Sequence, residues 1–356
     1  MLNRNAARQD SQVAPYLVPV PADGRPRQRF ADVEHALRSV HLIISSSFAR
    51  AEPRLRALHY MHGLAGILVE PAQARRNIAS GSGRHRTEGA QRLLTTAQWD
   101  EGKARARLRD LVLKRAGPGG ILYVIEASFV KRGSSAVATE RQCSVDSGWI
   151  ESCQSAILLF YGTADGCLFL IDIDLYVPRD WVASEERRRY AKMPPNIVYR
   201  SKSRMARDMV DRATALGLAP ERVVLSLFCA EKGSLLRWLQ GRRTQYLAGL
   251  TAGEFRDLAA VGPVAANGML LTDRSAARDS VTPYQTAAYY RAASRRALTD
   301  GDVNRMIAEA RRMDIRWRSM RQQIRIDRYE VRGWRGWQRH MTLAMAAQIA
   351  TELAGH

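Results

Sequence analysis

The sequence has few lysines, no closely spaced cysteines and no long apolar run, and these shortages narrow the class of protein. Its 356 residues include four cysteines, none of them in a CxxC spacing, so no zinc or redox motif is indicated. The cysteines are predicted to be reduced core residues. No apolar run is long enough to span a membrane, and the N-terminus has no apolar signal core. The histidines are scattered and form no cluster of metal ligands. These absences predict a cytoplasmic protein.

Although lysine is scarce, the chain is strongly basic. Its formal net charge is +20, and all but six of its Lys and Arg residues are arginines. Such a charge favours a polyanionic partner, most simply nucleic acid. A membrane surface competes, but no basic amphipathic stretch adjoins an exposed apolar one. The planar guanidinium suits bidentate contacts with phosphate and guanine, whereas a GC-rich genome would produce the same bias without functional demand. Composition leaves both explanations open.

The N-terminal third is predicted to be helical. Residues 1–28 are polar and contain four prolines, which indicates a flexible arm. In residues 29–117 apolar residues recur at three- and four-residue steps, interrupted by a flexible connector at 81–89. This helical domain is a candidate DNA-binding domain. A Gly-Pro-Gly-Gly break at 117–120 ends it.

The rest of the chain has an α/β pattern. Residues 118–346 are assigned to the core, with a poorly patterned insertion around 241–300, and residues 347–356 to a C-terminal tail. Four apolar runs predict buried strands, at 121–125, 156–161, 167–173 and 222–228. We expect the first three to lie adjacent in a mixed sheet, with the fourth beside the first.

Several short motifs recur in a recognisable order from about residue 48 to 346. They are FARAEPR (48–54), YMHGL (60–64), RRN (75–77), DRYEVR (327–332), WRGW (334–337) and RHMTL (339–343). In order and spacing they resemble the DDE-class insertion-sequence transposases, which are bacterial enzymes of DNA recombination and transposition. The resemblance implies an RNase H-like mixed sheet with flanking helices, preceded by an α-helical N-terminal domain. It also implies DNA as partner, a place on the nucleoid and a possible homodimer.

The resemblance implies a site of three carboxylates, two on strands and one on a helix. In the family these hold two divalent metals, one activating the nucleophile and the other stabilising the leaving oxygen. The first strand of the family ends in Asp-Asp-Thr, where this chain has Ile125, Glu126 and Ala127. The first ligand therefore falls at Ile125 or Glu126, the second at Ser226 and the third at Asp314.

The catalytic positions are thus altered. We assign them to Glu126, Ser226 and Asp314, of which only Glu126 and Asp314 remain candidate metal ligands. Mg²⁺ is expected only if the protein is active, because this ion demands oxygen ligands in near-octahedral geometry.

Other aspartates offer an alternative metal site. Asp172 and Asp174 alternate on a predicted strand and share one of its faces, while Asp208 and Asp211 lie on a predicted helix. We favour the simpler interpretation, in which the strand pair consists of surface carboxylates at the edge of a sheet.

Arginines recur at three- and four-residue steps near the C-terminus. If helical, they would form one stripe able to follow DNA phosphates, although Gly333 and Gly336 are expected to break the helix. The stripe consists of Arg318, Arg321, Arg325, Arg328, Arg332, Arg335 and Arg339.

Three hypotheses follow from these observations. The first is a transposase-like DNA-binding protein, derived from an insertion sequence, in which DNA cleavage and strand transfer are lost or impaired. The second is an active transposase that uses Glu126, Asp314 and an unrecognised third ligand. The third is a repurposed regulator or interaction module.

Overall fold

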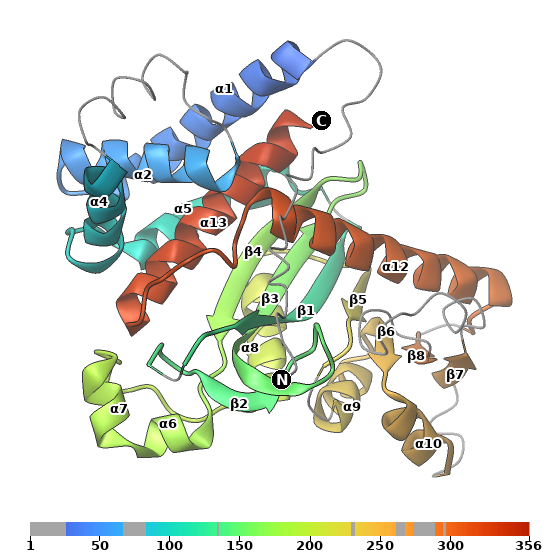
Figure 1. Cartoon of the computed structure of the whole chain (residues 1–356). Coiled ribbons are helices and arrows are strands. Elements are labelled where there is room, and N and C mark those ends of the chain that lie inside the picture. Colours follow the sequence, from blue (N-terminus) through green and yellow to red (C-terminus); the bar gives the residue numbers. More distant parts are fainter. Residues whose placement is uncertain are drawn as a thin grey trace, which may run out of the picture.

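In the computed structural model, helices cover both faces of a mixed β-sheet (Figure 1). The structure describes residues 26–66, 83–117, 119–133, 135–228, 232–260, 268–272, 289–294 and 297–355. The predicted N-terminal arm lies almost wholly outside these residues. The α/β expectation is confirmed.

The sheet is built around strand β1 (Ile121–Val130). On one side β1 pairs antiparallel with β3 (Ile150–Gly162), and on the other it pairs parallel with β5 (Arg222–Leu225). Strand β3 pairs in turn with β2 (Glu140–Cys143) and β4 (Leu168–Leu175). The predicted order of the four apolar runs is therefore confirmed. Strand β1 reads as a continuous apolar run because both of its faces are covered.

The poorly patterned insertion extends the sheet. Strand β6 (Gln245–Leu250) pairs parallel with β5, and β8 (Tyr289–Ala293) joins β6 to β7 (Gly268–Thr272). Helix α10 (Ala252–Ala260) lies between β6 and β7 in the chain.

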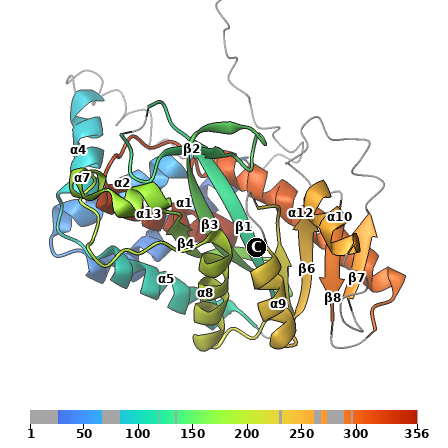
Figure 2. The ribbon, with the colours of Figure 1, turned by 90° about the horizontal axis from the view of Figure 1, so that it is seen from below.

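Different helices cover the two faces of the sheet (Figures 1 and 2). One face carries α12 (Asp300–Gln323) and α13 (Trp334–Ala354). The opposite face carries α8 (Lys202–Ala215) and α9 (Gly233–Gly241). The short helices α6 (Arg179–Ala183) and α7 (Glu185–Tyr190) follow β4. This division decides which side chains of β1 can meet.

The N-terminal helices surround the last helix of the chain rather than forming a separate body. Helix α13 runs among these helices and is buried from Gly336 to Ala350, except for Gln338. The surrounding helices are α1 (Pro26–Ile44), α2 (Ala51–Leu64), α4 (Gly83–Thr95) and α5 (Glu101–Arg115), with a short 3-10 turn at Ser45–Ser47.

One boundary prediction is corrected. Residues 83–89 of the predicted connector belong to α4, which packs against α2. Turn-forming residue types alone do not reveal this helix, because tertiary packing stabilises it. Residues 347–354 of the segment assigned as a C-terminal tail are the last part of α13, and Ala347, Gln348 and Ile349 are buried.

Cysteine states differ in part from the prediction. Cys153 and Cys167 are free and buried, as expected. Cys143 is disulfide-bonded, so the expectation of four reduced cysteines is wrong. Among the described helices, none is both long and apolar enough to cross a membrane.

A candidate site between the sheet and helix α12

Alternation along β1 sends neighbouring side chains to opposite faces. Phe129 faces the α12 side, where its ring lies 5.4 Å from the Arg321 guanidinium. Ile125 shares this face because it lies four residues earlier in an unbroken strand. Glu126 faces the α8 side, where its carboxylate accepts a 2.6 Å hydrogen bond from Lys202 Nζ.

Ser226 lies beside Ile125. Strand β5 runs parallel to β1 with Leu225 opposite Val124, so the next pair in register is Ile125 and Ser226. The backbone N–H of Ser226 donates to the Val124 carbonyl at 3.0 Å and continues the ladder past the end of β5. The second family position therefore adjoins Ile125 rather than Glu126.

Helix α12 brings Asp314 over the same face. A capping box at Thr299 and Asp302 starts the helix, and its apolar stripe includes Ala310, Met313 and Trp317. The Trp317 ring packs against Phe160 with centroids 5.8 Å apart. These contacts hold the adjoining Asp314 close to the sheet.

Together these elements form an open cleft. Its lining includes all three predicted catalytic positions, although Glu126 directs its carboxylate to the far side of the sheet. The lining residues are Ile125, Glu126, Val145, Asp146, Ser226, Leu227, Asp314, Trp317 and Arg318.

Asp314 is the carboxylate that α12 contributes to this cleft. Burial raises its pKa to about 7, and the nearby Arg318 guanidinium opposes this shift. No hydrogen bond joins Asp314 to another residue in the described part of the chain. Ser226 adds a neutral hydroxyl, which donates to the Leu227 carbonyl at 3.2 Å.

The buried Glu126 carboxylate is held entirely by protein groups. Besides Lys202, it accepts a 2.8 Å hydrogen bond from Ser155 Oγ. Both Glu126 and Lys202 are buried, so the ion pair balances two charges that would each be costly to bury alone. The sequence does not single out Lys202, because no spacing links it to a residue 76 positions earlier.

Asp146 is a second residue of the cleft that the sequence pattern does not reveal. It lies between β2 and β3, and its Oδ2 accepts hydrogen bonds from Arg321 Nη1 at 2.6 Å and from the Ser128 backbone at 3.2 Å. Its neighbours Val145 and Ser147 have no metal-binding pattern, so only the fold reveals its place in the cleft.

The cleft does not fit a pair of divalent metals. Ile125 offers no ligand atom, Ser226 offers no charge, and Asp146 already bonds to Arg321. Within the described ranges, no group of three or more His, Cys, Asp and Glu residues is placed to hold a metal ion.

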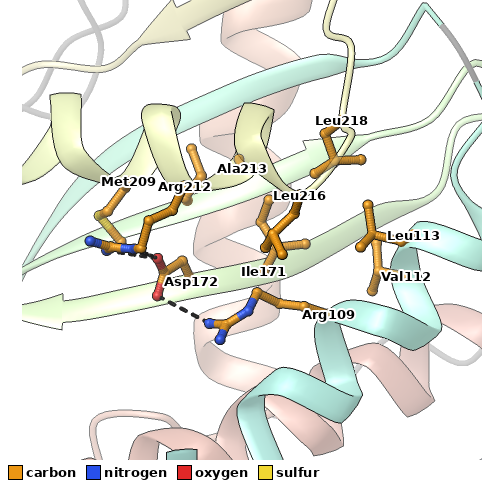
Figure 3. Close-up of a pocket in the computed structure, with 11 residues that line it drawn as sticks. Arg109, Val112, Leu113, Ile171, Asp172, Met209, Arg212, Ala213, Leu216 and Leu218 are labelled. Carbon is orange, nitrogen blue, oxygen red and sulfur yellow. Dashed lines mark hydrogen bonds and ion pairs between the residues drawn. The ribbon is translucent and has the colours of Figure 1, made fainter.

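The two strand aspartates of the alternative metal site form ion pairs with arginines. Figure 3 shows Arg109 and Arg212 converging on Asp172 from α5 and α8. The Asp172 carboxylate lies 2.8 Å from Arg212 and 3.9 Å from Arg109, and Asp174 lies 2.6 Å from Arg200. Asp172 is buried, so its interpretation as a surface carboxylate is wrong, but these ion pairs explain its burial without a metal.

The two helical aspartates of the alternative site also form ion pairs with arginines. Asp208 pairs with Arg204 at 2.7 Å, and Asp211 pairs with Arg242 at 2.6 Å. The Asp172–Arg212 pair therefore joins β4 to α8, whereas Asp208 pairs within α8 and Asp211 pairs with the residue that follows α9.

The C-terminal arginines do not lie on one helix. Helix α12 ends at Gln323 and α13 begins at Trp334, so the stripe is divided by residues 324–333, which we call the connection. Arg339 is buried, and its guanidinium donates to the carbonyls of Leu93 and Trp99. Arg321 is largely enclosed by Asp146 and the Ser128 carbonyl. These two guanidiniums are committed to protein groups.

Four other arginines of the stripe are exposed: Arg325, Arg328, Arg332 and Arg335. None of the four forms an ion pair with a residue in the described part of the chain. The connection that carries most of them is fixed from both sides. Val137 N–H donates to the Arg332 carbonyl at 2.7 Å, and Lys131 Nζ lies 3.3 Å from the centre of the Tyr329 ring. Arg318 remains at the cleft.

The chain matches a known family over more than half of its length. A family model described as DDE superfamily endonuclease matches residues 48–266. The matched segment includes β1, β3, β4, β5 and β6 and therefore Ile125 and Ser226, but it ends before Asp314. No curated protein matches the chain.

Proposed function

Since the chain belongs to the DDE superfamily endonucleases, a transposase family with an RNase H-like core, we propose that it is a DNA-binding protein whose cleft no longer cuts DNA. In this proposal the family fold and its affinity for DNA are kept, whereas cleavage and strand transfer are lost. The protein would then associate with the nucleoid through DNA.

The observation that carries the proposal is the pairing of Ile125 with Ser226 on the face below Asp314. Two metal ligands of the family would have to come from these two neighbouring positions. An isoleucine cannot coordinate Mg²⁺, and a serine hydroxyl does not provide the charge that offsets dehydration of this ion. One carboxylate of raised pKa is left where three ionised carboxylates are needed.

Glu126 does not make up the loss. Its carboxylate would have to leave the Lys202 and Ser155 hydrogen bonds and cross the plane of the sheet. Such a movement would leave the buried Lys202 ammonium without its partner, which is costly in a buried site.

The net charge of the chain and the exposure of its C-terminal arginines support DNA binding. The net charge is +20, and the four exposed arginines around the connection offer their guanidiniums to solvent. Such groups contact phosphates without selecting sequence, so binding should weaken steeply with salt.

The test combines binding with cleavage. The full chain is mixed with labelled duplexes from the DNA that flanks its gene, with Mg²⁺, Mn²⁺ or EDTA. We expect binding at about 50 mM salt that is lost at higher salt, and intact DNA in every mixture. Metal-dependent cleavage by the unmodified protein would overturn the proposal, as would a failure to bind at low salt.

An active enzyme is the second candidate, and Asp146 is the observation that favours it. This carboxylate lines the same cleft as Asp314 and could provide a third oxygen ligand if Arg321 moved away. Cleavage that disappears in both Asp146→Asn and Asp314→Asn, but persists in Asp174→Asn, would establish this alternative.

The proposed homodimer is tested separately. Light scattering of the full chain with and without DNA should report twice the mass of one chain if a dimer forms. A mass of one chain under both conditions would exclude it.

A further inference from the structure

A groove lies at the edge of the sheet where β5 and β6 begin, and we call it the α8–α9 groove. It offers about 520 Å³ to the centres of water-sized molecules, within the range of about 300–1,000 Å³ for ligand pockets. It shares no lining residue with the cleft. The lining comes from the ends of α8 and α9, the starts of β5 and β6 and the residue after β8: Val210, Thr214, Pro220, Glu221, Val223, Trp238, Arg242, Arg243, Thr244, Gln245 and Ser294.

Trp238 is the aromatic residue of this groove. It lies on α9 and is half-buried, so its ring packs against the core and is also partly open to solvent. The guanidiniums of Arg207 and Arg242 lie 5.3 and 5.1 Å from the centre of the ring, which restricts its position. The buried Val210 and Val223 line the groove as well. The groove therefore has an apolar surface with a large ring in a fixed place.

The charges beside Trp238 are positive in sum. Asp211 lies 2.6 Å from Arg242 and 3.8 Å from Arg207, so one carboxylate meets two guanidiniums. Arg243 is exposed and adds another guanidinium to the lining. This cationic rim, consisting of Arg207, Arg242 and Arg243, favours a ligand that carries negative charge.

The rest of the groove counts against a nucleic acid as that ligand. Glu221 lines it with a half-exposed carboxylate, and Arg222, which lies 3.2 Å from Glu221, is shared with Glu309 at 3.6 Å. The C-terminal ends of α8 and α9 also reach the groove, and the dipole of a helix is negative at this end. A continuous row of phosphates would therefore be attracted at the rim and repelled beside it.

A peptide matches this mixture of groups. Its apolar side chain can pack on Trp238, and neighbouring acidic side chains can meet the cationic rim. Its backbone can bond to the side chains of Thr214, Thr244 and Gln245, which supply donors and acceptors without charge. Tryptophan and arginine are also the residues that most often provide the binding energy of protein interfaces.

We propose that the α8–α9 groove binds a peptide segment of another protein, in which an apolar side chain is flanked by aspartate or glutamate. Helices α8 and α9 lie on the opposite face of the sheet from α12 and α13 (Figure 2). A peptide in this groove therefore leaves the connection and its exposed arginines open. The proposal does not depend on DNA binding.

The experiment first selects peptides and then measures their affinity. A library of random peptides displayed on phage is selected on the immobilised full chain, with excess duplex DNA present to occupy other cationic surfaces. Enriched peptides are synthesised with a fluorescent label and titrated by anisotropy. We expect them to carry an aromatic or aliphatic residue between acidic residues, and we expect their affinity to fall as salt rises.

Matched variants assign the binding to the groove. Trp238→Ala should weaken the selected peptides by about 30-fold or more, as expected for an aromatic residue at the centre of an interface. Trp149→Ala is the control, because Trp149 is 75% exposed between β2 and β3 and does not line the groove. Arg243→Glu changes the exposed rim without altering the ring and should weaken the same peptides severalfold. Thermal unfolding shows which variants fold, and Arg243→Glu provides the test if Trp238→Ala does not.

The outcomes separate this proposal from DNA binding. A selection that enriches no peptide over empty beads would overturn the groove, as would peptides that bind both variants as tightly as the unmodified chain. Enriched peptides without acidic residues would contradict the role of the cationic rim. A single-stranded oligonucleotide whose binding is lost in Trp238→Ala would show a nucleic acid in the groove and overturn the peptide. A chain that binds the selected peptides but no duplex would keep this proposal and remove only the DNA-binding function.

Discussion

A shift of one residue along β1 decides whether a side chain meets α12 or α8. Ile125 and Glu126 are adjacent in sequence, yet only Ile125 directs its side chain to the face that carries Asp314. An acidic residue at 126 therefore stabilises Lys202 instead of the cleft. The chemistry lost from this site depends on strand geometry as much as on residue type.

Restoring two aspartates should therefore restore metal binding. In Ile125→Asp/Ser226→Asp, three carboxylates would meet on one face, and we expect a rise in melting temperature of several degrees with Mn²⁺. The matched variant Glu126→Asp/Ser226→Asp should show no rise, because residue 126 faces α8. If Mn²⁺ raised the melting temperature of both double variants equally, residues 125 and 126 would not face opposite sides of the sheet as assigned.

The raised pKa of Asp314 predicts how stability changes with pH. Its folded-state pKa is about 7 and its ordinary value is 3.8, so between these values the folded chain keeps a proton that the unfolded chain has lost. The free energy of unfolding should therefore fall as pH rises from about 4 to 7. The charged or titratable groups around it are Arg318 on α12, Tyr290 on β8 and Asp146 beside β2.

Asp314→Asn should remove this dependence. Urea unfolding should show the variant more stable than the unmodified chain at pH 8, with the difference shrinking towards pH 4. A constant difference across this range would contradict the assignment.

The sequence predicted which residues share this site better than it predicted their roles. The family resemblance assigned Ser226 and Asp314 to the site, and both line the cleft. The choice between Ile125 and Glu126 stayed open because a strand pattern buried on both faces does not say which face meets α12. Asp146 comes from a segment with a weak pattern, so only tertiary packing reveals its position.

At the scale of elements, the connection between α12 and α13 separates two kinds of arginine. Arg335 is exposed at the start of α13, whereas Arg339, one turn later, is buried against Trp99 and Glu101. Regular spacing could not distinguish them, because the N-terminal helices that enclose α13 are remote in sequence.

Replacing Arg339 should lower the stability of the protein, whereas replacing Arg335 should weaken its binding to DNA. Arg339→Ala would remove a buried donor from the Trp99 carbonyl and the cationic partner from Glu101, and we expect a loss of about 3 kcal/mol or more in unfolding free energy. Arg335→Ala should leave stability nearly unchanged and weaken DNA binding. Urea denaturation and anisotropy on both variants check this, and normal stability of Arg339→Ala would refute the structural role.

Helix α13 also protects the open edge of β4. Gln348 acts as a surrogate strand: its amide donates to the Leu168 carbonyl at 2.6 Å, and its oxygen accepts from Leu170 N–H at 2.7 Å. An edge strand needs such cover against pairing with other chains.

Gln348→Ala should therefore destabilise the protein by roughly 1–3 kcal/mol, because two buried backbone groups lose their partners. Urea unfolding gives the value, and Gln322→Ala, at an exposed position on α12, is the control. Similar small losses in both variants would argue against the surrogate-strand role.

For the molecule as a whole, the helical N-terminal region and the sheet form one connected core. Helix α13 packs on α1, α2, α4 and α5 as well as on β4, and a single cluster of buried residues extends from Ala36 to Ala350. The strand order and most helices were predictable from periodicity. The packing of the N-terminal helices against α13 and the sheet was not predictable, because it depends on contacts between segments about 300 residues apart.

The distribution of charge over this core leads to the last prediction. Replacing Arg325, Arg328, Arg332 and Arg335 with alanine lowers the net charge from +20 to +16, since four cations are removed. Replacing Arg38, Arg115, Arg204 and Arg305 lowers it equally, but each of these arginines already forms an ion pair with a carboxylate of the protein.

If phosphates are neutralised by the exposed arginines, only the first variant releases fewer counterions on binding. Its slope of log affinity against log salt should become less steep by about 3–4, because each neutralised phosphate accounts for roughly 0.9 of the slope. The control should keep a slope near that of the unmodified chain. Anisotropy titrations between about 50 and 200 mM salt measure all three slopes. Equal reductions in the two variants would mean that net charge, rather than this surface, attracts the DNA.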